Sequence, residues 1–459
     1  MAGQDMPSQS EERPRLRPLE AFSVEQDGQR VVGLRDPAGF THQVALLPMP
    51  LLDLVSLFDG DHTVEEMQAI LRDRHGEAPT AAEIAGVIDR LDEGGFLDSP
   101  RFAEQRRAIE EAFRQSPVRP AAHAGGAYAG QAAALRAQID SFFHHLRGPI
   151  SSPLASPPAA ARQTGPRHAQ QSHQASGPTV DHLQGPRNGP RTPPAADAPG
   201  GGYPRGLIAP HIDFHRGGPT YAWAYRELAE APVAPDLFVI LGTCHAGMAD
   251  PFAATLKPYE TPLGAAPVDR DFFEALQRRY GHDLRASEDA HRIEHSIEFQ
   301  AVMLRHLFGE RPFTILPVLA SFLHEAVWTK SDPERDPRIP RFIDALLGTM
   351  AACRRPVCLI AGVDLAHVGP RFGDPEPNTE EALRDVEAAD RSMLESVMEG
   401  DPIGFYGAVS FDGDSRRICG LSPIYTFLRA LPGVRGRLLR YRQWPDSAGA
   451  VSFCAAVFP

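Results

Sequence analysis

The sequence has few cysteines and no long hydrophobic run. Its five cysteines among 459 residues are scattered and odd in number, a pattern that does not fit the disulfide framework of a small secreted protein. The first residues are polar and carry no apolar signal core, and no later run approaches the ~18 consecutive apolar residues of a membrane helix. We therefore expect a cytoplasmic protein that is not embedded in a membrane.

Basic residues are also in the minority. The formal net charge of -13 argues against nucleic-acid binding, because phosphate contacts need a concentrated basic face. The chain has no glycine-rich phosphate loop of the Walker or dinucleotide kind, so nucleotide-driven reactions are not expected. Its hydrophobic content of 42% is enough to build a large core in about two or three domains.

Composition divides the chain into an N-terminal and a C-terminal part. The stretch between them is rich in proline, glycine, alanine, glutamine and serine and has no apolar period, so it cannot bury enough apolar area to fold. Its His168, His173 and His182 are too widely spaced to define a preformed metal site. The predicted organisation is a disordered tail (1–17), a small domain (18–100), a helical linker (101–116) and a larger domain (117–459) with a disordered insert (148–203).

The small domain is predicted to contain a β unit followed by two capped helices. Thr63 with Glu66, and Thr80 with Glu83, form the capping-box pattern that opens a helix. Phe96-Leu97 is a candidate for the start of a wing strand. This winged-helix-like α+β pattern, with the segment FDGDHTVEEMQAIL, resembles the PqqD-like domains that bind peptides in modification systems.

Two other interpretations of the small domain stay open. It is either an ordinary helical domain whose apolar face packs on its neighbour, or a DNA-binding winged helix. The second helix carries only one basic residue, Arg90, which disfavours DNA binding.

The larger domain alternates strand and helix patterns, which predicts an α/β fold with a layered central sheet flanked by helices. Three of its buried-type strands end shortly before a histidine: His211, His245 and His367. In open α/β sheets the cleft lies beyond the carboxyl ends of the strands, so these side chains are expected to converge. The alternative for any one of them is a hydrogen-bonded turn residue.

A metal site is the interpretation we favour for this edge of the sheet. Imidazoles, with the thiolate of Cys419, suit iron, copper or zinc. Arg416, Arg417 and a following helix N-terminus are expected to favour that thiolate. Asp364, three residues before His367, is a candidate to orient an imidazole or to act as a general base.

Other candidates lie nearby in the sequence. Glu294 and Glu298 share a helix face beside His295 and either line the same cleft or stabilise a helix N-terminus. His291 and His215 are candidates for the rim of the cleft. A thiol-hydrolase alternative takes Cys419 or Cys244 as the nucleophile, without any family-type cysteine signature. The remaining cysteines, expected in the core, are Cys353, Cys358 and Cys454.

An ordered series of motifs resembles the Memo-like family, whose prokaryotic members are often called protein B of the AmmeMemoRadiSam system. The motifs are HAGGAY from 123, IAPH to 211, ILGTCH to 245, YETPLG from 259, EHSIE from 294, ILPVL from 315, DLAHVG from 364 and ICG from 418. The resemblance covers about 117–459 without the insert; the small domain and the insert are expected to lie outside the usual family pattern.

The resemblance implies a fold like that of class III extradiol dioxygenases, with metal ligands at His211, His245 and Cys419. It places His367 at the catalytic base position and marks Asp364 and His295 as cleft residues. It further implies iron(II) or copper as the metal, and AMMECR-type and radical-SAM proteins as partners. We therefore expect a metal-dependent oxidoreductase acting in a modification-type system. The alternative is a non-enzymatic, metal-containing adaptor that binds peptide or protein partners in its cleft.

Overall fold

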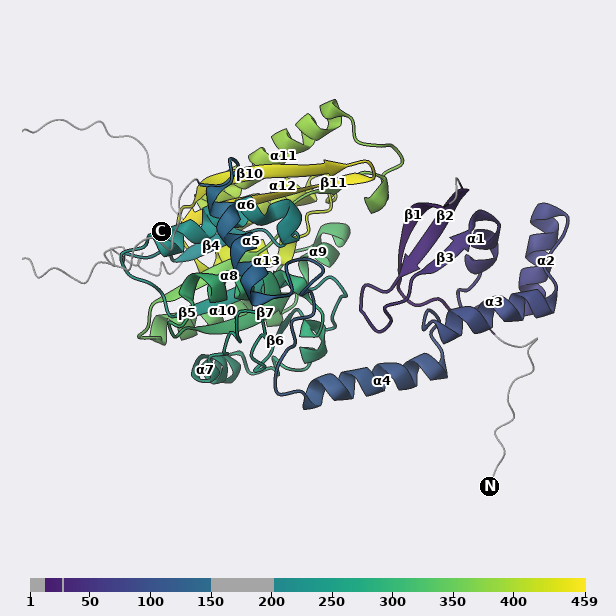
Figure 1. Cartoon of the computed structure of the whole chain (residues 1–459), viewed down its shortest axis with the longest axis horizontal. Helices are drawn as coiled ribbons and strands as arrows, with labels where there is room; N and C mark the ends of the chain where they lie inside the picture. The colour runs from purple at the N-terminus through teal and green to yellow at the C-terminus, as the bar shows by residue number, and fades with distance from the viewer. Residues whose placement is uncertain (1–12, 27–28, 150–201) are drawn as a thin grey trace, which may run out of the picture.

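The protein contains two separate β-sheets. The computed structural model describes residues 13–26, 29–149 and 202–459, so most of the predicted tail and insert lies outside the described residues. Within these ranges, one sheet has three strands and the other has eight. Figure 1 shows the smaller sheet in the purple N-terminal unit and the larger sheet within the teal-to-yellow C-terminal unit.

The N-terminal unit is an antiparallel sheet followed by helices. Both predicted capping boxes are present, and Met67 and Ile84 from the two capped helices are fully buried. The sheet precedes the helices, and the comparison with winged-helix and PqqD-like domains stays a prediction. The elements are β1 (Glu20–Gln26), β2 (Gln29–Arg35), β3 (Ala45–Pro48), α1 (Met49–Val55), α2 (Val64–His75), α3 (Ala81–Glu93) and α4 (Pro100–Gln115).

Two local expectations for this unit are wrong. The end of the predicted tail is ordered, because buried Arg17 donates to Asp36 over 2.9 Å and to the carbonyl of Gly95 over 2.8 Å. Leu97 pairs with Leu16 in a single bridge and does not begin a wing strand. The backbone of residues 15–17 pairs with that of residues 96–98 through two hydrogen bonds, Arg17 N–H to Phe96 and Asp98 N–H to Arg15.

Helix α4 joins the two units, in agreement with the predicted helical linker. The loop after β2 also touches the C-terminal unit directly. The guanidinium of Arg292 donates to the carbonyls of Ala38 and Gly39, the latter over 3.1 Å. The N-terminal unit is therefore held against the C-terminal unit at the segment that precedes His295.

The eight-stranded sheet has the order β10-β11-β4-β8-β5-β7-β6, and β9 pairs with β11. Its four central strands, β4, β8, β5 and β7, are parallel, whereas the outer strands are antiparallel. The strands are β4 (Gly206–Ala209), β5 (Leu237–Thr243), β6 (Phe252–Ala254), β7 (Thr314–Ala320), β8 (Val357–Gly362), β9 (His367–Val368), β10 (Arg437–Asp446) and β11 (Gly449–Phe458).

Helices cover both faces of this sheet, as predicted for a layered α/β domain. Alternate strand residues enter two separate apolar clusters: Phe238 and Ile240 pack with α5, α6 and α8, whereas Val239 and Leu241 pack with α7, α10 and α13. The helices are α5 (Ala132–His144), α6 (Phe214–Ala229), α7 (Arg270–Tyr280), α8 (His295–Phe308), α9 (Leu323–Thr329), α10 (Arg338–Ala352), α11 (Glu380–Glu399), α12 (Pro402–Ser410) and α13 (Leu421–Ala430), with short 3-10 turns at Glu288–His291 and Pro370–Phe372.

The parallel register brings three strand ends to one edge of the sheet. Ala209 of β4 and Gly242 of β5 are both register partners of Gly362 of β8. Because neighbouring parallel strands end at the same edge, the turns that follow lie side by side. None of the helices within the described ranges has both the length and the apolarity needed to cross a bilayer.

Candidate metal centre

The turn after β4 is tied to the turn after β8. The backbone N–H of His211 donates to the buried carboxylate of Asp364 over 3.0 Å. Gly362 allows α8 to approach closely, since a Cβ at this position would lie 2.4 Å from the carbonyl oxygen of Ser296. The lack of a side chain at Gly362 therefore brings the start of α8 up to the strand ends.

The loop before α13 folds back onto the same edge. The backbone N–H groups of Cys419 and Gly420 donate to the carbonyls of Leu365 and Asp364, each over 3.0 Å. A Cβ on Gly420 would lie 2.8 Å from the Asp364 carbonyl oxygen, so a larger residue would push the loop away. These contacts place the Cys419 side chain among the turns after the strands.

Three histidines and one cysteine converge at this edge. Ligand atoms of His211, His245 and His295 all lie within 4.8 Å of one another. The Sγ of Cys419 lies 3.1 Å from Nε2 of His211 and 3.2 Å from Nε2 of His245. The structure thus offers two three-residue donor sets that share His211 and His245, one completed by Cys419 and the other by His295.

Hydrogen bonds fix the orientation of two of the imidazole rings. Nδ1 of His211 lies 3.0 Å from the carbonyl oxygen of Gly362, and Nδ1 of His245 lies 3.0 and 3.1 Å from the two carboxylate oxygens of Glu294. Because these acceptors take the Nδ1 proton, Nε2 is on both rings the atom that faces the Cys419 sulfur, and loss of its proton would leave it free to bind a metal. Such outer partners are typical of metal-binding histidines.

Glu294 anchors the second strand end to helix α8. Its buried carboxylate accepts from the backbone N–H of His245 and from that of Ser296, each over 2.9 Å, and it is the N-cap of α8. The His295 ring, one residue later, stacks on the His245 ring at a centroid distance of 4.6 Å. One carboxylate therefore caps the helix, orients His245 and helps to place His295.

Charges within the cluster favour the thiolate of Cys419. Burial opposes ionisation, but the positive charges of His211 and His245 outweigh it and hold the thiol pKa well below its ordinary value. Burial lowers the pKa of His211, yet the charges of Cys419 and Asp364 dominate and raise it to about 9. The thiolate is the form that ligates a metal, so the cysteine needs little further activation.

His295 has a different environment from the other two histidines. Burial lowers its pKa well below the ordinary value, and the neighbouring His245 and His211 lower it further against the opposing charge of Glu294. A neutral imidazole is able either to ligate a metal or to exchange a proton. The geometry is compatible with both its predicted role in catalysis and a role as a ligand.

His367 lies apart from the converged side chains. It begins β9, its Nδ1 lies 3.1 Å from the carbonyl oxygen of Leu365, and its ring meets that of Phe372 at 5.0 Å. Within the described residues it forms no hydrogen bond or ring contact with the three clustered histidines. Asp364, predicted alongside it, contacts His211, and burial raises the pKa of its carboxyl group.

Several other candidates do not line this centre. His291 is fully buried, not at a rim, and hydrogen-bonds Tyr259 over 2.7 Å. Glu298 binds the buried guanidinium of Arg119 and does not line the cleft beside Glu294. Burial raises the pKa of Cys244 to about 12, which disfavours the nucleophile interpretation. Cys358 and Cys454 are buried as predicted, whereas Cys353 is half-buried.

One residue near the centre had not been singled out as a site residue. His123, from the segment before α5, places its ring 5.5 Å from that of His295 and its Nε2 2.7 Å from the carbonyl oxygen of Ile293. The only sequence signal for it was the HAGGAY motif, in which it is the first residue.

A family model described as "Memo-like protein" matches residues 191–456, more than half of the chain. The chain belongs to the Memo-like family. The matched region contains all four converged residues, His211, His245, His295 and Cys419, while His123 and the N-terminal unit lie outside it.

Similar Memo proteins are found in bacteria and archaea. A "MEMO1 family protein" of Aquifex aeolicus is 26% identical over 97% of this chain and 100% of its own length. Relatives in Thermus thermophilus and Methanopyrus kandleri are 25% and 29% identical over 83% and 55% of this chain, and over 93% and 82% of their own lengths. The Aquifex relative aligns along nearly the whole chain, whereas the Methanopyrus relative aligns with little more than half of it, so some Memo proteins share the N-terminal part and others match the C-terminal part alone.

Proposed function

We propose that this protein binds iron(II) or copper through His211, His245 and Cys419 and acts as a metal-dependent oxidoreductase. The observation that carries the proposal is the convergence of two Nε2 atoms, oriented by bonds at Nδ1, on one thiol sulfur 3.1 and 3.2 Å away. Such a nitrogen and sulfur donor set suits iron, copper or zinc and disfavours magnesium or calcium, which prefer oxygen ligands.

The protein residues have distinct roles in this proposal. A bound iron or copper ion would supply one-electron redox chemistry. Glu294 and the Gly362 carbonyl hold the rings of His245 and His211 in place, and Asp364 fixes the backbone at His211. His295, close to both rings, is the nearest group for proton exchange. His367 keeps its predicted catalytic role only if substrate reaches the edge of the sheet at β9.

Metal analysis of variants tests the ligand assignment. Full-length wild-type protein is expected to retain close to one equivalent of iron or copper after anaerobic loading and desalting. His211→Ala and Cys419→Ala are expected to lose it, whereas the matched controls His324→Ala, at an exposed histidine, and Cys353→Ala, at a half-buried cysteine, are expected to retain it. Unchanged metal content in both site variants would sink the assignment.

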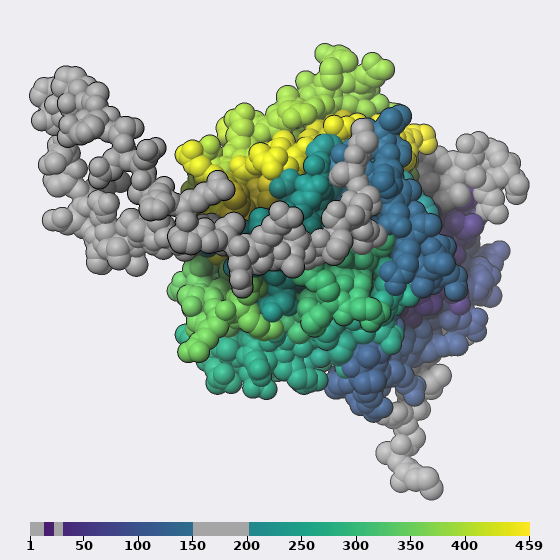
Figure 2. All heavy atoms as spheres, turned by 60° about the vertical axis from the view of Figure 1, so that its left-hand side comes forward, coloured from purple at the N-terminus to yellow at the C-terminus, as the bar shows by residue number. Residues whose placement is uncertain are grey.

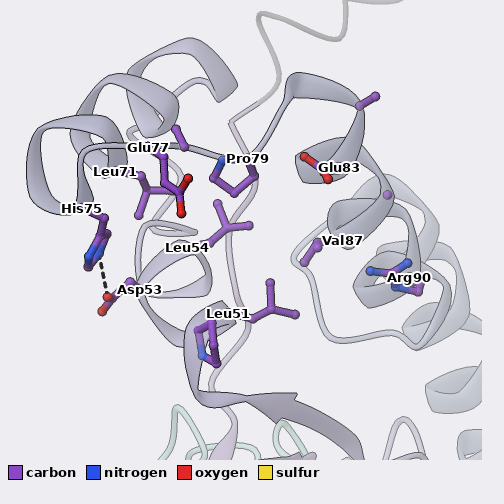
Figure 3. A pocket seen from close by; sticks show the side chains of 14 residues that line it. Leu51, Asp53, Leu54, Leu71, His75, Glu77, Pro79, Glu83, Val87 and Arg90 are labelled. Carbon is purple, nitrogen blue, oxygen red and sulfur yellow. Dashed lines mark ion pairs between the residues drawn. The ribbon is translucent and has the colours of Figure 1, made fainter.

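The adaptor alternative is favoured by a chain of cavities in the N-terminal unit. A cavity of about 620 Å³ between α1, α2 and α3 (Figure 3) shares Leu51, Val87 and Arg90 with one of about 390 Å³ along β3. That second cavity shares Gln43 and Val44 with one of about 750 Å³. The third cavity lies between the two units and is lined by residues of both, among them His123 and Ile293 of the C-terminal unit.

An extended peptide is the ligand that best suits this path. Strand β3 is at the edge of its sheet, with Val44 and Leu46 about half exposed, and an edge strand offers unpaired backbone groups to an extended chain. The path ends at His123, whose ring neighbours that of His295. A peptide held there would reach the metal centre, so one protein could both bind a peptide and carry out the proposed redox reaction.

The proposed partners are AMMECR-type and radical-SAM proteins of the same organism. Co-purification of each purified partner with full-length protein tests the path, using Leu46→Asp and, as an exposed apolar control on the C-terminal unit, Ile403→Asp. Loss of partner in Leu46→Asp with metal content unchanged favours the adaptor interpretation. Equal retention by wild type and Leu46→Asp would refute binding along β3.

A further inference from the structure

A small cationic pocket lies on the sheet face covered by α6. It has a volume of about 140 Å³, and its lining includes Arg147, Arg216 and Arg442 together with His145 and His215. Trp444 and Phe453 line it too. None of the four converged residues of the metal centre lines this pocket, so it is a separate site.

Strand β10 and helix α6 build the pocket. Tyr441 points to the opposite face, where its hydroxyl donates to the carboxylate of buried Asp390 over 2.8 Å. Since side chains alternate along a strand, Arg440 and Arg442 face α6. The first turns of α6 add His215 and Arg216.

The chain after α5 closes the pocket. The carbonyl of Arg147 accepts from the indole N–H of Trp223 on α6 over 2.9 Å, and the N–H of Arg147 donates to the ring of His145 over 3.0 Å. Figure 2 shows this blue segment lying against the teal surface that includes α6. Arg147 is thus anchored through its backbone, which leaves its guanidinium available to the pocket.

Carboxylates of the described residues balance only part of the positive charge in the pocket, and the negative charge of Glu387 acts on Arg442 without forming an ion pair with it. Arg216 pairs with Asp213 over 2.6 Å, but none of the ion pairs within the described ranges involves Arg147 or Arg442. Burial lowers the pKa of Arg442, and the charges of Arg147 and Arg440 lower it further. Nε of Arg440 is buried without a hydrogen-bond partner in the described structure.

Neighbouring arginines repel one another, so the concentration of positive charge in this pocket carries an electrostatic cost. A bound anion would remove the repulsion. Guanidinium groups bind the oxygens of phosphate in pairs of parallel hydrogen bonds, and two guanidinium groups, Arg147 and Arg442, match the charge of a dianion. A monocarboxylate would leave one positive charge uncompensated.

We propose that this pocket binds a phosphate dianion, supplied either as inorganic phosphate or as the phosphate group of a small monoester. Arg442 and Arg147 provide the main charge-assisted contacts, and His145, His215 and Arg216 surround them. The pocket would be a phosphate-binding site, and this proposal does not depend on the proposed metal function.

Titration calorimetry of the full-length protein at low ionic strength tests the proposal, with inorganic phosphate and glycerol 3-phosphate as the two probes. Wild type is expected to bind at least one of them saturably, and Arg442→Gln to bind it roughly tenfold more weakly or worse. Arg147→Gln, at an exposed position where the substitution leaves the core unchanged, is expected to show the same loss. Binding of the monoester identifies an organic source, and binding of phosphate alone identifies the free ion.

Two controls separate this pocket from other sites. Arg437→Gln removes one charge from the same strand, at a residue paired with Glu227 over 3.2 Å outside the pocket, and is expected to bind like wild type. Cys419→Ala is expected to retain binding, because the pocket is not the metal centre. The proposal is overturned by absence of saturable binding of both probes, by retained affinity in both arginine variants, or by loss of binding in either control.

Discussion

Replacing Glu294 by glutamine is expected to weaken metal binding without removing any ligand. The carboxylate accepts from Nδ1 of His245, from the backbone N–H of His245 and from that of Ser296, at distances of 2.9 to 3.1 Å. Glutamine is nearly the same size, but one acceptor oxygen becomes an NH₂ group. At least one of these three donors then faces another donor.

The size of the effect follows from what the carboxylate does for His245. It fixes the tautomer, orients the ring and makes Nε2 more electron-rich, and loss of such a partner typically costs about 10- to 100-fold in metal affinity. That range corresponds to about 1.4 to 2.8 kcal/mol. The upper half is expected here, because Glu294 is buried and water has little access to replace the lost acceptor.

Competition with a chromophoric chelator, anaerobically for iron(II), measures this affinity. Glu294 is also the N-cap of α8, so helix capping needs its own control. Asp401→Asn changes the exposed N-cap carboxylate of α12, which touches none of the four converged residues, and is expected to leave metal affinity unchanged. Equal metal affinity in wild type and Glu294→Gln would refute the orienting role, and an equal loss in Asp401→Asn would assign the effect to general destabilisation.

Three further variants test the fold around the centre. Arg119→Met leaves the Glu298 carboxylate buried without its ion-pair partner, which is expected to cost about 3–5 kcal/mol in urea unfolding; an unchanged midpoint contradicts this. Thr80→Ala removes the cap of α3, at a cost of about 1 kcal/mol, whereas no change would mean that solvent replaces the cap. Burial lowers the pKa of His291 from 6.5 to about 4, so the unfolded state alone gains a proton between these values. The free energy of unfolding should therefore decrease as the pH is lowered from 6.5 to about 4, by about 3 kcal/mol more in wild type than in His291→Gln. Identical pH profiles of the two proteins would contradict this prediction.

The strand-end rule was sufficient to predict part of the centre. His211 and His245 follow β4 and β5, the two parallel strands on either side of β8, and their convergence depends only on that register. The same rule failed for His367. The chain runs on past β8 through Asp364 to Ala366, and the next residues pair with β11 as strand β9, which moves the third histidine away from the other two.

The positions of the other two converged side chains, Cys419 and His295, depend on tertiary packing. Cys419 arrives on a loop held by backbone bonds to Asp364 and Leu365, and its place was implied by family resemblance, not by any local period. His295 joins the cluster because Gly362 lets α8 approach β8, a distance that no sequence pattern encodes. Strand β10 is difficult to recognise from the sequence, because arginines occupy the face toward α6 and hide its alternation.

Two members of the proposed donor set, His211 and Cys419, come from opposite ends of the C-terminal unit. His211 and Cys419 are separated by 208 positions in the chain. During synthesis on the ribosome, the centre is therefore incomplete until nearly all of the sheet has emerged. Closing so long a loop is entropically costly before the intervening strands have paired. If the proposed metal binds here, its uptake therefore has to follow the folding of the sheet, and an ion-delivery protein would act on the folded chain.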